Sequence, residues 1–215
     1  MSGGDQTEGV ARRHLCFPHC EPGQRIGLFG GSFNPPHEGH LLVSELGLSR
    51  LKLDQIWWLV TPGNPLKDHS NLAPLARRLE ACEALARHPA MKVTAVEAVL
   101  NSRYTADTLA KIASRFQAND FVWLMGADNL GQFHLWERWR EIAGTFPIGV
   151  IDRPGSTLSL HSAQGAIALS RFRMDEDDAA LLARQRPPAW TFIHGPRNSL
   201  SSTLLRSRAA SAVKA

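Results

Sequence analysis

Residues 29–40 read FGGSFNPPHEGH, and this stretch decides the fold class. It begins at the end of an apolar run, residues 26–29, of the kind that forms a buried strand. The glycine pair that follows allows a sharp turn, the two prolines stiffen the loop, and a helix is predicted to begin near His37. A buried strand that leads through a glycine turn into a helix indicates an α/β fold.

The same alternation continues along the chain. Six short apolar runs have the length and composition of strands buried on both faces: residues 25–30, 55–61, 91–96, 121–125, 147–152 and 190–194. Between them, the segments from Leu72 and from Thr105 are apolar at the spacing of one helical face. The sequence therefore predicts a parallel sheet with helices on both faces, and such sheets bind ligands outside the carboxyl ends of their strands.

Composition narrows the class of protein. With 215 residues, 43% hydrophobic content and six Trp, the chain can fill one well-packed core. No apolar run approaches the roughly 20 residues that a membrane span needs, and no secretory signal precedes the first strand. Three Cys argue against a disulfide framework, so we expect a cytoplasmic protein.

The charge of the chain argues against a nucleic-acid partner. The net charge is +4, and the Lys and Arg residues are spread along the sequence rather than gathered in a block. A small anionic ligand fits this balance better than DNA or RNA does.

Residues 1–24 come before the first strand and have no apolar periodicity. We expect a disordered N-terminal tail, or the product of a start codon placed too far upstream, followed by a folded domain over residues 25–210. Four residues of types that bind zinc lie in the tail: His14, Cys16, His19 and Cys20. Their crowding fits no usual zinc spacing, so a zinc site in the tail is the minor alternative to an unstructured extension.

The loop at residues 30–40 has the chemistry of a phosphate site. The backbone amides of Gly30 and Gly31 can point at phosphate oxygens, and the start of the next helix adds unpaired N–H groups and a positive dipole. His37 and His40, three residues apart, lie on one face of that first turn and can donate hydrogen bonds to developing negative charge. Neither the G-x-G-x-x-G spacing nor the G-x-x-x-x-G-K-[ST] loop occurs, which excludes both common nucleotide motifs.

Residues 37–40, HEGH, resemble the H-x-G-H signature of the nucleotidyltransferase superfamily. Residues 200–206, LSSTLLR, are similar to its second signature, I-S-S-T-x-x-R. Here Ser201 can cap a helix, and the Ser202 and Thr203 hydroxyls can meet phosphate oxygens, with Arg206 one turn further on. Taken together, the two stretches resemble the two halves of a triphosphate site.

Within the superfamily, the chain looks like bacterial nicotinate-nucleotide adenylyltransferases. The likeness covers about residues 25–208 and is carried by the opening motif, by SRYTADTL at 102–109 and by MGADNLGQFHLWERWREI at 125–142, supported by DRPG at 152–155. It implies a Rossmann-like nucleotidyltransferase fold in a domain over residues 25–210. It also implies a reaction in which ATP and nicotinate mononucleotide give deamido-NAD and pyrophosphate, with Mg²⁺ accompanying ATP.

The resemblance assigns roles to individual residues. ATP would be held by the backbone of Gly30, Gly31, Ser32 and Phe33, by His37 and His40, by Ser202, Thr203 and Arg206 at its β and γ phosphates, by Asp128 near the ribose and by Arg153 near the adenine. The pyridine-carboxylate end would be formed by Tyr104, Thr105 and Ala106, with Trp136 stacked on the ring. Two of these residues could instead have purely structural roles, Trp136 as a core residue and Asp128 as a helix cap.

One departure from the family concerns residues 65–67, which read PLK where many relatives carry Pro-His-Lys. The missing His puts the role of that loop in doubt, although Lys67 could still reach a phosphate. We assign no catalytic carboxylate, because the attacking phosphate of nicotinate mononucleotide is already anionic. The acidic run DEDD at 175–178 is interpreted as a solvated helix start rather than a metal site.

Two other functions stay open from the sequence. One is a different H-x-G-H enzyme, such as a phosphopantetheine adenylyltransferase or a cytidylyltransferase. Those enzymes are typically shorter, and the Tyr104 to Ala106 stretch with Trp136 argues against them. The other is a catalytically silent nucleotide sensor, against which the intact His37, His40 and Arg206 argue.

Overall fold

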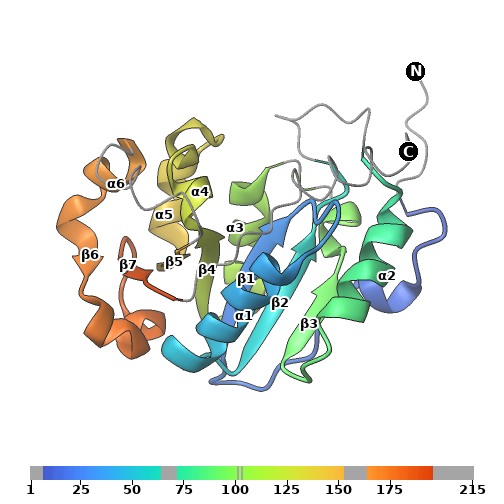
Figure 1. Cartoon of the computed structure of the whole chain (residues 1–215), viewed down its shortest axis with the longest axis horizontal. Helices are drawn as coiled ribbons and strands as arrows, with labels where there is room; N and C mark the ends of the chain where they lie inside the picture. Colours follow the sequence, from blue (N-terminus) through green and yellow to red (C-terminus); the bar gives the residue numbers. More distant parts are fainter. Residues whose placement is uncertain (1–6, 64–71, 101, 103, 153–163, 196–215) are drawn as a thin grey trace, which may run out of the picture.

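The computed structural model describes residues 7–63, 72–100, 102, 104–152 and 164–195. Its centre is a parallel sheet of seven strands in the order β3-β2-β1-β4-β5-β7-β6 (Figure 1). The strands are β1 (Arg25–Gly31), β2 (Gln55–Val60), β3 (Met91–Thr94), β4 (Asp120–Gly126), β5 (Ile148–Ile151), β6 (Arg173–Met174) and β7 (Trp190–Ile193). The predicted fold class, a parallel α/β sheet, is confirmed.

Helices cover both faces of the sheet, with α1 in front and α3 behind in the view of Figure 1. The α-helices are α1 (Glu38–Arg50), α2 (Leu75–Leu85), α3 (Thr105–Arg115), α4 (Ala127–Leu130), α5 (Trp139–Thr145) and α6 (Gln164–Ala168). The 3₁₀ helices are η1 (Arg12–Leu15), η2 (Val96–Ala98), η3 (Phe133–Leu135), η5 (Ser170–Phe172) and η6 (Glu176–Arg184). None of the helices in these described stretches is both long and apolar enough to cross a bilayer.

Two hydrophobic cores fill the spaces between sheet and helices. Successive residues of a strand point to opposite faces, so Leu28 enters the core under α3 and α5 while Phe29 enters the core under α1 and α2. Both residues are almost fully buried. This double burial explains why the strands appear in the sequence as continuous apolar runs.

The order of the strands places the topological switch point of the sheet beside β1. The chain runs outward through β2 and β3, then returns to lay β4 against the other side of β1. In open α/β sheets, ligands bind at this switch point, outside the carboxyl ends of the strands. The H-x-G-H loop leaves β1 at that point, and α4 follows β4 directly.

The expectation of a disordered N-terminal tail is wrong for residues 7–24, which pack against the domain. His14 is buried, and its Nε2 lies 2.7 Å from a carboxylate oxygen of Glu83 in α2. The Thr94 hydroxyl donates to the carbonyl oxygens of His14 (3.0 Å) and Cys16 (2.8 Å). The Phe17 ring packs between Trp57 and Phe116, at centroid distances of 6.3 and 5.2 Å.

The contacts of the same segment can be compared with the alternative of a zinc site in the tail. Its four zinc-type side chains make separate contacts, with Glu83 for His14, the Arg13 carbonyl for Cys16, Glu21 for His19 and Asn119 for Cys20. No cluster of three or more His, Cys, Asp or Glu residues suited to a metal occurs in the described part of the chain. The acidic run at 175–178 starts η6, where the Asp175 carboxylate accepts from the Asp177 N–H, in agreement with its interpretation as a helix start.

Candidate active site

The side chains of the two histidines cap the start of α1. The Gly39 N–H donates to Nδ1 of His37, and the His37 N–H donates to Nδ1 of His40, both at 3.1 Å. The two imidazoles therefore satisfy backbone N–H groups at the helix start, in the pattern of a capping box. Their ring centroids lie 3.9 Å apart, which confirms the expectation that the rings lie together.

These caps fix the tautomer of each ring. A neutral imidazole has one N–H and one acceptor nitrogen, and in both rings Nδ1 is the acceptor. The proton of each neutral ring must then sit on Nε2. Both histidines are buried, with 5% exposure for His37 and 9% for His40, so each Nε2–H is held at the helix start as an oriented donor.

Aromatic side chains fix the position of His40. Its ring lies 4.9 Å from that of Phe33 and 5.8 Å from that of Phe29. Phe33 is itself stacked on Trp58, at 4.9 Å and an interplanar angle of 9°. Its φ of 46° turns the backbone sharply so that the side chain, 1% exposed, can enter the core. The side chain of Phe33 is therefore a core residue, and only its backbone remains a candidate for ligand contact.

Gly30 proves to be a glycine for a different reason than expected. Its φ is not positive, since the positive-φ glycines among the described residues are Gly9 and Gly23. A Cβ on Gly30 would instead collide with the Trp123 ring, whose Cη2 lies 2.5 Å away. A Cβ on Gly31 would lie 3.2 Å from the Phe33 ring. The glycine pair thus makes room for two aromatic rings.

Arg78 is a residue of this region that the sequence analysis missed. It is 2% exposed and donates to the backbone carbonyls of Ala73, Ser32, Thr61 and Pro62. It therefore ties the loop after β1 to the loop after β2. A signal was present, because Arg78 stands three residues after Leu75 and one before Leu79, on the apolar face of its helix.

The predicted pyridine-binding residues lie where α3 begins. Tyr104 is the N-cap residue of α3, and Thr105 is its first residue, as expected. The side chain of Ala106 belongs to the core at 3% exposure, so a ligand could use only its backbone. The N-cap residue makes no side-chain cap to this helix start.

Trp136 packs next to these residues. It is half-buried against the core, with its ring edge-on to Trp123 (6.2 Å) and Phe133 (5.7 Å). Two residues later, Arg138 pairs with Asp107 of α3 at 2.5 Å and with Glu141 at 2.6 Å. Both ion pairs raise the pKa of Arg138, and the pair with Asp107 connects the Trp136 segment to the start of α3.

Glu97, in η2, contacts the first turn of α3. Thr108 donates to its carboxylate at 3.0 Å. Burial of this carboxyl raises its pKa, and hydrogen bonds from Thr108 and Thr61 oppose the shift without cancelling it. Glu97 thus connects α3 to the loop after β2.

The remaining assigned residues divide into two groups. Asp128 is exposed in the first turn of α4, directly after β4, which agrees with its predicted place in the turn after that strand. Lys67, Arg153, Ser202, Thr203 and Arg206 lie outside the described residues, and their roles stay predictions.

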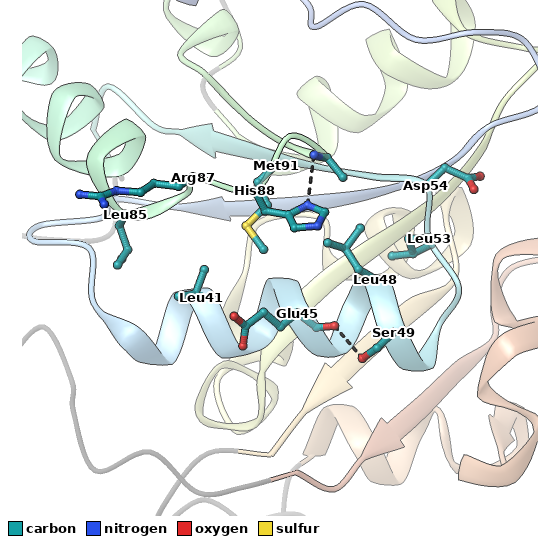
Figure 2. Close-up of a pocket in the computed structure, with 11 residues that line it drawn as sticks. Leu41, Glu45, Leu48, Ser49, Leu53, Asp54, Leu85, Arg87, His88 and Met91 are labelled. Atoms are coloured by element: carbon teal, nitrogen blue, oxygen red, sulfur yellow. Dashed lines mark hydrogen bonds between the residues drawn. The ribbon is translucent and has the colours of Figure 1, made fainter.

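A groove of ≈ 690 Å³ lies elsewhere on the domain. Figure 2 shows Leu41, Glu45 and Leu48 of α1 on one side of it, and Leu85 and His88 on the other. Its lining also includes residues 53–54 and 90–91, next to the amino ends of β2 and β3. The groove contains none of the residues assigned to substrate and opens at the opposite end of those strands from the histidine loop.

Comparisons with known proteins agree with this arrangement. A family model of cytidylyltransferase-like proteins matches residues 28–208. A curated protein of Mesorhizobium japonicum named "Probable nicotinate-nucleotide adenylyltransferase" is 62% identical over 90% of this chain and 99% of its own length. Proteins with the same name from Rhizobium johnstonii (58% identical, covering 88% of this chain and 96% of that protein) and Brucella abortus (64%, covering 84% and 93%) match similarly.

Solved structures support the fold. The Plasmodium falciparum nicotinic acid mononucleotide adenylyltransferase, in complexes with APC and with NaAD, superposes with a TM-score of 0.61 over 86% of this chain and 83% of that one. The sequence identity is 16%. At that identity the likeness shows the fold alone, which is the Rossmann-like nucleotidyltransferase fold.

Proposed function

Because this chain belongs to the cytidylyltransferase-like family, with nicotinate-nucleotide adenylyltransferases among its close relatives, we propose that it transfers the adenylyl group of ATP to nicotinate mononucleotide. The products are deamido-NAD and pyrophosphate, so the reaction belongs to NAD biosynthesis. The cytoplasmic location, and the absence of a nucleic-acid partner, stay predictions from the sequence.

The observation that carries this proposal is the oriented pair His37 and His40. With both Nδ1 atoms accepting from the backbone, both Nε2–H groups are donors at the start of α1, where the helix dipole also favours an anion. Donors fixed before reaction stabilise charge that develops on a phosphoryl group without further reorganisation. We assign His40 to the α-phosphate of ATP, and His37 beside it.

The chemistry is an in-line displacement. A phosphate oxygen of nicotinate mononucleotide forms a bond to the α-phosphorus, the bond from that phosphorus to the oxygen bridging to the β-phosphate breaks, and pyrophosphate leaves. The nucleophile carries a negative charge already, so no proton has to be removed. The protein contributes alignment and charge stabilisation, which are the main sources of rate in such transfers.

Mg²⁺ fits this site as a companion of ATP rather than as a resident ion. The described residues hold no group of three potential ligands, and Mg²⁺ usually binds through substrate phosphates and water with few protein ligands. Bound in that way, it would neutralise part of the triphosphate charge.

Asp128, exposed at the carboxyl end of β4, is assigned to the ribose of ATP.

On the acceptor side, we assign the start of α3 to the pyridine carboxylate and Trp136 to stacking on the ring. The N–H groups of Thr105 and Ala106 stand in the first turn of a helix whose N-cap makes no side-chain cap. A carboxylate suits that position because it accepts charge-assisted hydrogen bonds and lies favourably in the helix dipole.

The test is a pyrophosphate-release assay with Mg-ATP and a panel of acceptors. We expect release with nicotinate mononucleotide and formation of deamido-NAD. Release only with phosphopantetheine, or only with CTP in place of ATP, would support another enzyme of the superfamily. Nucleotide binding without release for any acceptor would support the silent sensor.

A further inference from the structure

Arg78 makes an unusual set of contacts for a buried charge. Its Nη1 donates to the carbonyl oxygens of Ser32 and Thr61, both at 2.7 Å, its Nε donates to Ala73 at 2.9 Å and its Nη2 to Pro62 at 3.2 Å. All four acceptors are backbone carbonyls. A neighbouring bond, from the Ala73 N–H to Asn34 Oδ1 at 3.2 Å, strengthens the connection between α2 and the histidine loop.

In the described part of the chain, the hydrogen bonds of this guanidinium go to backbone carbonyls and not to carboxylates. No Asp or Glu pairs with Arg78 within the part of the chain that the structure describes. Burial lowers the pKa of Arg78, but an arginine stays protonated at physiological pH. Burial also raises the pKa of the nearby Cys82 thiol to about 12, so Cys82 stays neutral. Among the described residues, no acidic side chain pairs with the positive charge that Arg78 places under the loop between β1 and α1.

The bond to Ser32 fixes the direction of one peptide group. In a trans peptide the C=O of one residue and the N–H of the next point in opposite directions. Because the Ser32 carbonyl points at Arg78, the N–H of Phe33 points away from Arg78 and toward the other side of the loop. Phe33 belongs to the backbone stretch assigned above to ATP.

We propose that Arg78 is a positioning residue for ATP, which orients the Ser32–Phe33 peptide so that the Phe33 N–H meets the triphosphate and adds its own charge beneath it. The inference rests on the proposed function, because it takes ATP to be the ligand of this loop. A purely structural tie would instead affect folding and leave the affinity for each substrate alone.

The experiment compares Arg78→Ala with its neighbour Arg77→Ala. Arg77 is exposed, and its contact is a 3.5 Å pair with Glu80, so it serves as a matched control in the same helix. For Arg78→Ala we expect the KM for ATP to rise about 10-fold or more, as for loss of a charge-assisted contact, while the KM for nicotinate mononucleotide stays within about twofold. Guanidinium at millimolar concentration, filling the space left by the side chain, should restore much of the loss. Arg77→Ala should match the wild type.

Arg78→Lys separates the orientation of the Ser32–Phe33 peptide from the contribution of the positive charge. It also covers the case in which the alanine variant does not fold. Lysine keeps the charge but cannot form the same fork of hydrogen bonds. We expect a KM for ATP between those of the wild type and Arg78→Ala, without rescue by guanidinium. The proposal is overturned if both substrates weaken equally in whichever variant folds, or if only the melting temperature changes. A wild-type protein that releases no pyrophosphate would instead overturn the function itself.

Discussion

The ring of Trp123 occupies the space into which a side chain at Gly30 would extend. The register of β1 and β4 places Trp123 opposite Leu28, yet its indole leans along the sheet until Cη2 lies 2.5 Å from where a Cβ of Gly30 would be. Trp123 is 2% exposed, and its ring also packs edge-on with that of Trp136. The glycine of the phosphate loop and the tryptophan assigned to the pyridine ring are therefore connected through a single buried side chain.

Gly30→Ala should destabilise the protein. The added methyl group meets a buried ring that has no free space to move into, and overpacking of this kind costs about 1–3 kcal/mol. Urea unfolding of the purified variant measures the loss.

Two further variants test whether the loss of stability comes from the contact with Trp123. Gly144 in α5 is exposed, with open space around its Cβ position, so Gly144→Ala should stabilise by up to about 1 kcal/mol through helix propensity. Trp123→Phe removes the outer ring atoms, so the double variant with Gly30→Ala should lose less stability than the sum of the single changes. Simple additivity would show that the clash has been misplaced.

His40→Ala should lower kcat by about 100-fold or more, as for loss of one oriented donor. The same change should also lower stability, because Nδ1 of His40 caps the His37 N–H. Loss of such a cap costs about 0.5–2 kcal/mol. Steady-state kinetics and thermal melting on the same preparation measure the two effects separately.

His40→Asn provides the comparison. Its side-chain oxygen can still accept from the His37 N–H, so we expect most of the stability to return while kcat stays low. A near-normal kcat in either variant would contradict the assignment of His40 to the α-phosphate.

Deleting residues 1–23 should destabilise the domain. The deletion removes the Phe17 ring from its place against Trp57 and the two carbonyls that accept from Thr94. Partial burial of one Phe and two hydrogen bonds together account for about 2–4 kcal/mol. Deleting residues 1–6 alone removes none of these contacts and should leave the urea midpoint unchanged. Equal midpoints for the two deletions would show that residues 7–23 contribute nothing.

Glu97 should make stability fall as pH rises. Its pKa in the folded protein is raised above the usual 4.5, so the folded state holds this proton more tightly than the unfolded chain. The contribution of Glu97 to stability is then fully present below pH 4.5 and is lost as the pH rises through its folded pKa. Glu97→Gln keeps an acceptor for Thr108 and should flatten this part of the profile between about pH 4 and 8, measured by urea unfolding. An unchanged profile would exclude Glu97 as the source.

The enzyme should prefer nicotinate mononucleotide over the amide by about 10-fold to 150-fold in kcat/KM, since a charged hydrogen bond is worth about 1.5–3 kcal/mol. Stacking on Trp136 is nearly indifferent to the ring substituent. Trp136→Ala should therefore weaken both acceptors together and leave their ratio nearly unchanged. Equal use of acid and amide by the wild type, or a ratio that collapses in the variant, would place the specificity elsewhere.

Much of the fold could be predicted because burial on both faces leaves long apolar runs in a sequence. The strands in those runs were found to within two residues at each end, whereas β6, with its two residues, leaves no such pattern. The histidine pair was predictable because its residue types and spacing are unusual at a helix start.

Contacts between distant segments were not predictable in the same way. The N-terminal segment is held by backbone carbonyls, by the ring of Phe17 and by the contact of His14 with Glu83, and none of these produces a periodic pattern. The role of Gly30 depends on Trp123, which lies 93 positions further along the sequence and reaches it only in the folded sheet. Arg78 likewise acts on carbonyl groups, which every residue carries.

The N-terminal segment also covers the carboxyl end of an outer strand of the sheet. β3 is the outermost strand on that side, and at its carboxyl end the Ala95 N–H donates to the His14 carbonyl at 2.7 Å while Thr94 is bonded to the same segment. An uncovered outer strand is a template on which a second molecule can add its own strand. At the opposite margin β6 offers only two residues for such pairing. We therefore expect that a chain that lacks the segment has a more exposed end of β3 and scatters light increasingly as its concentration is raised.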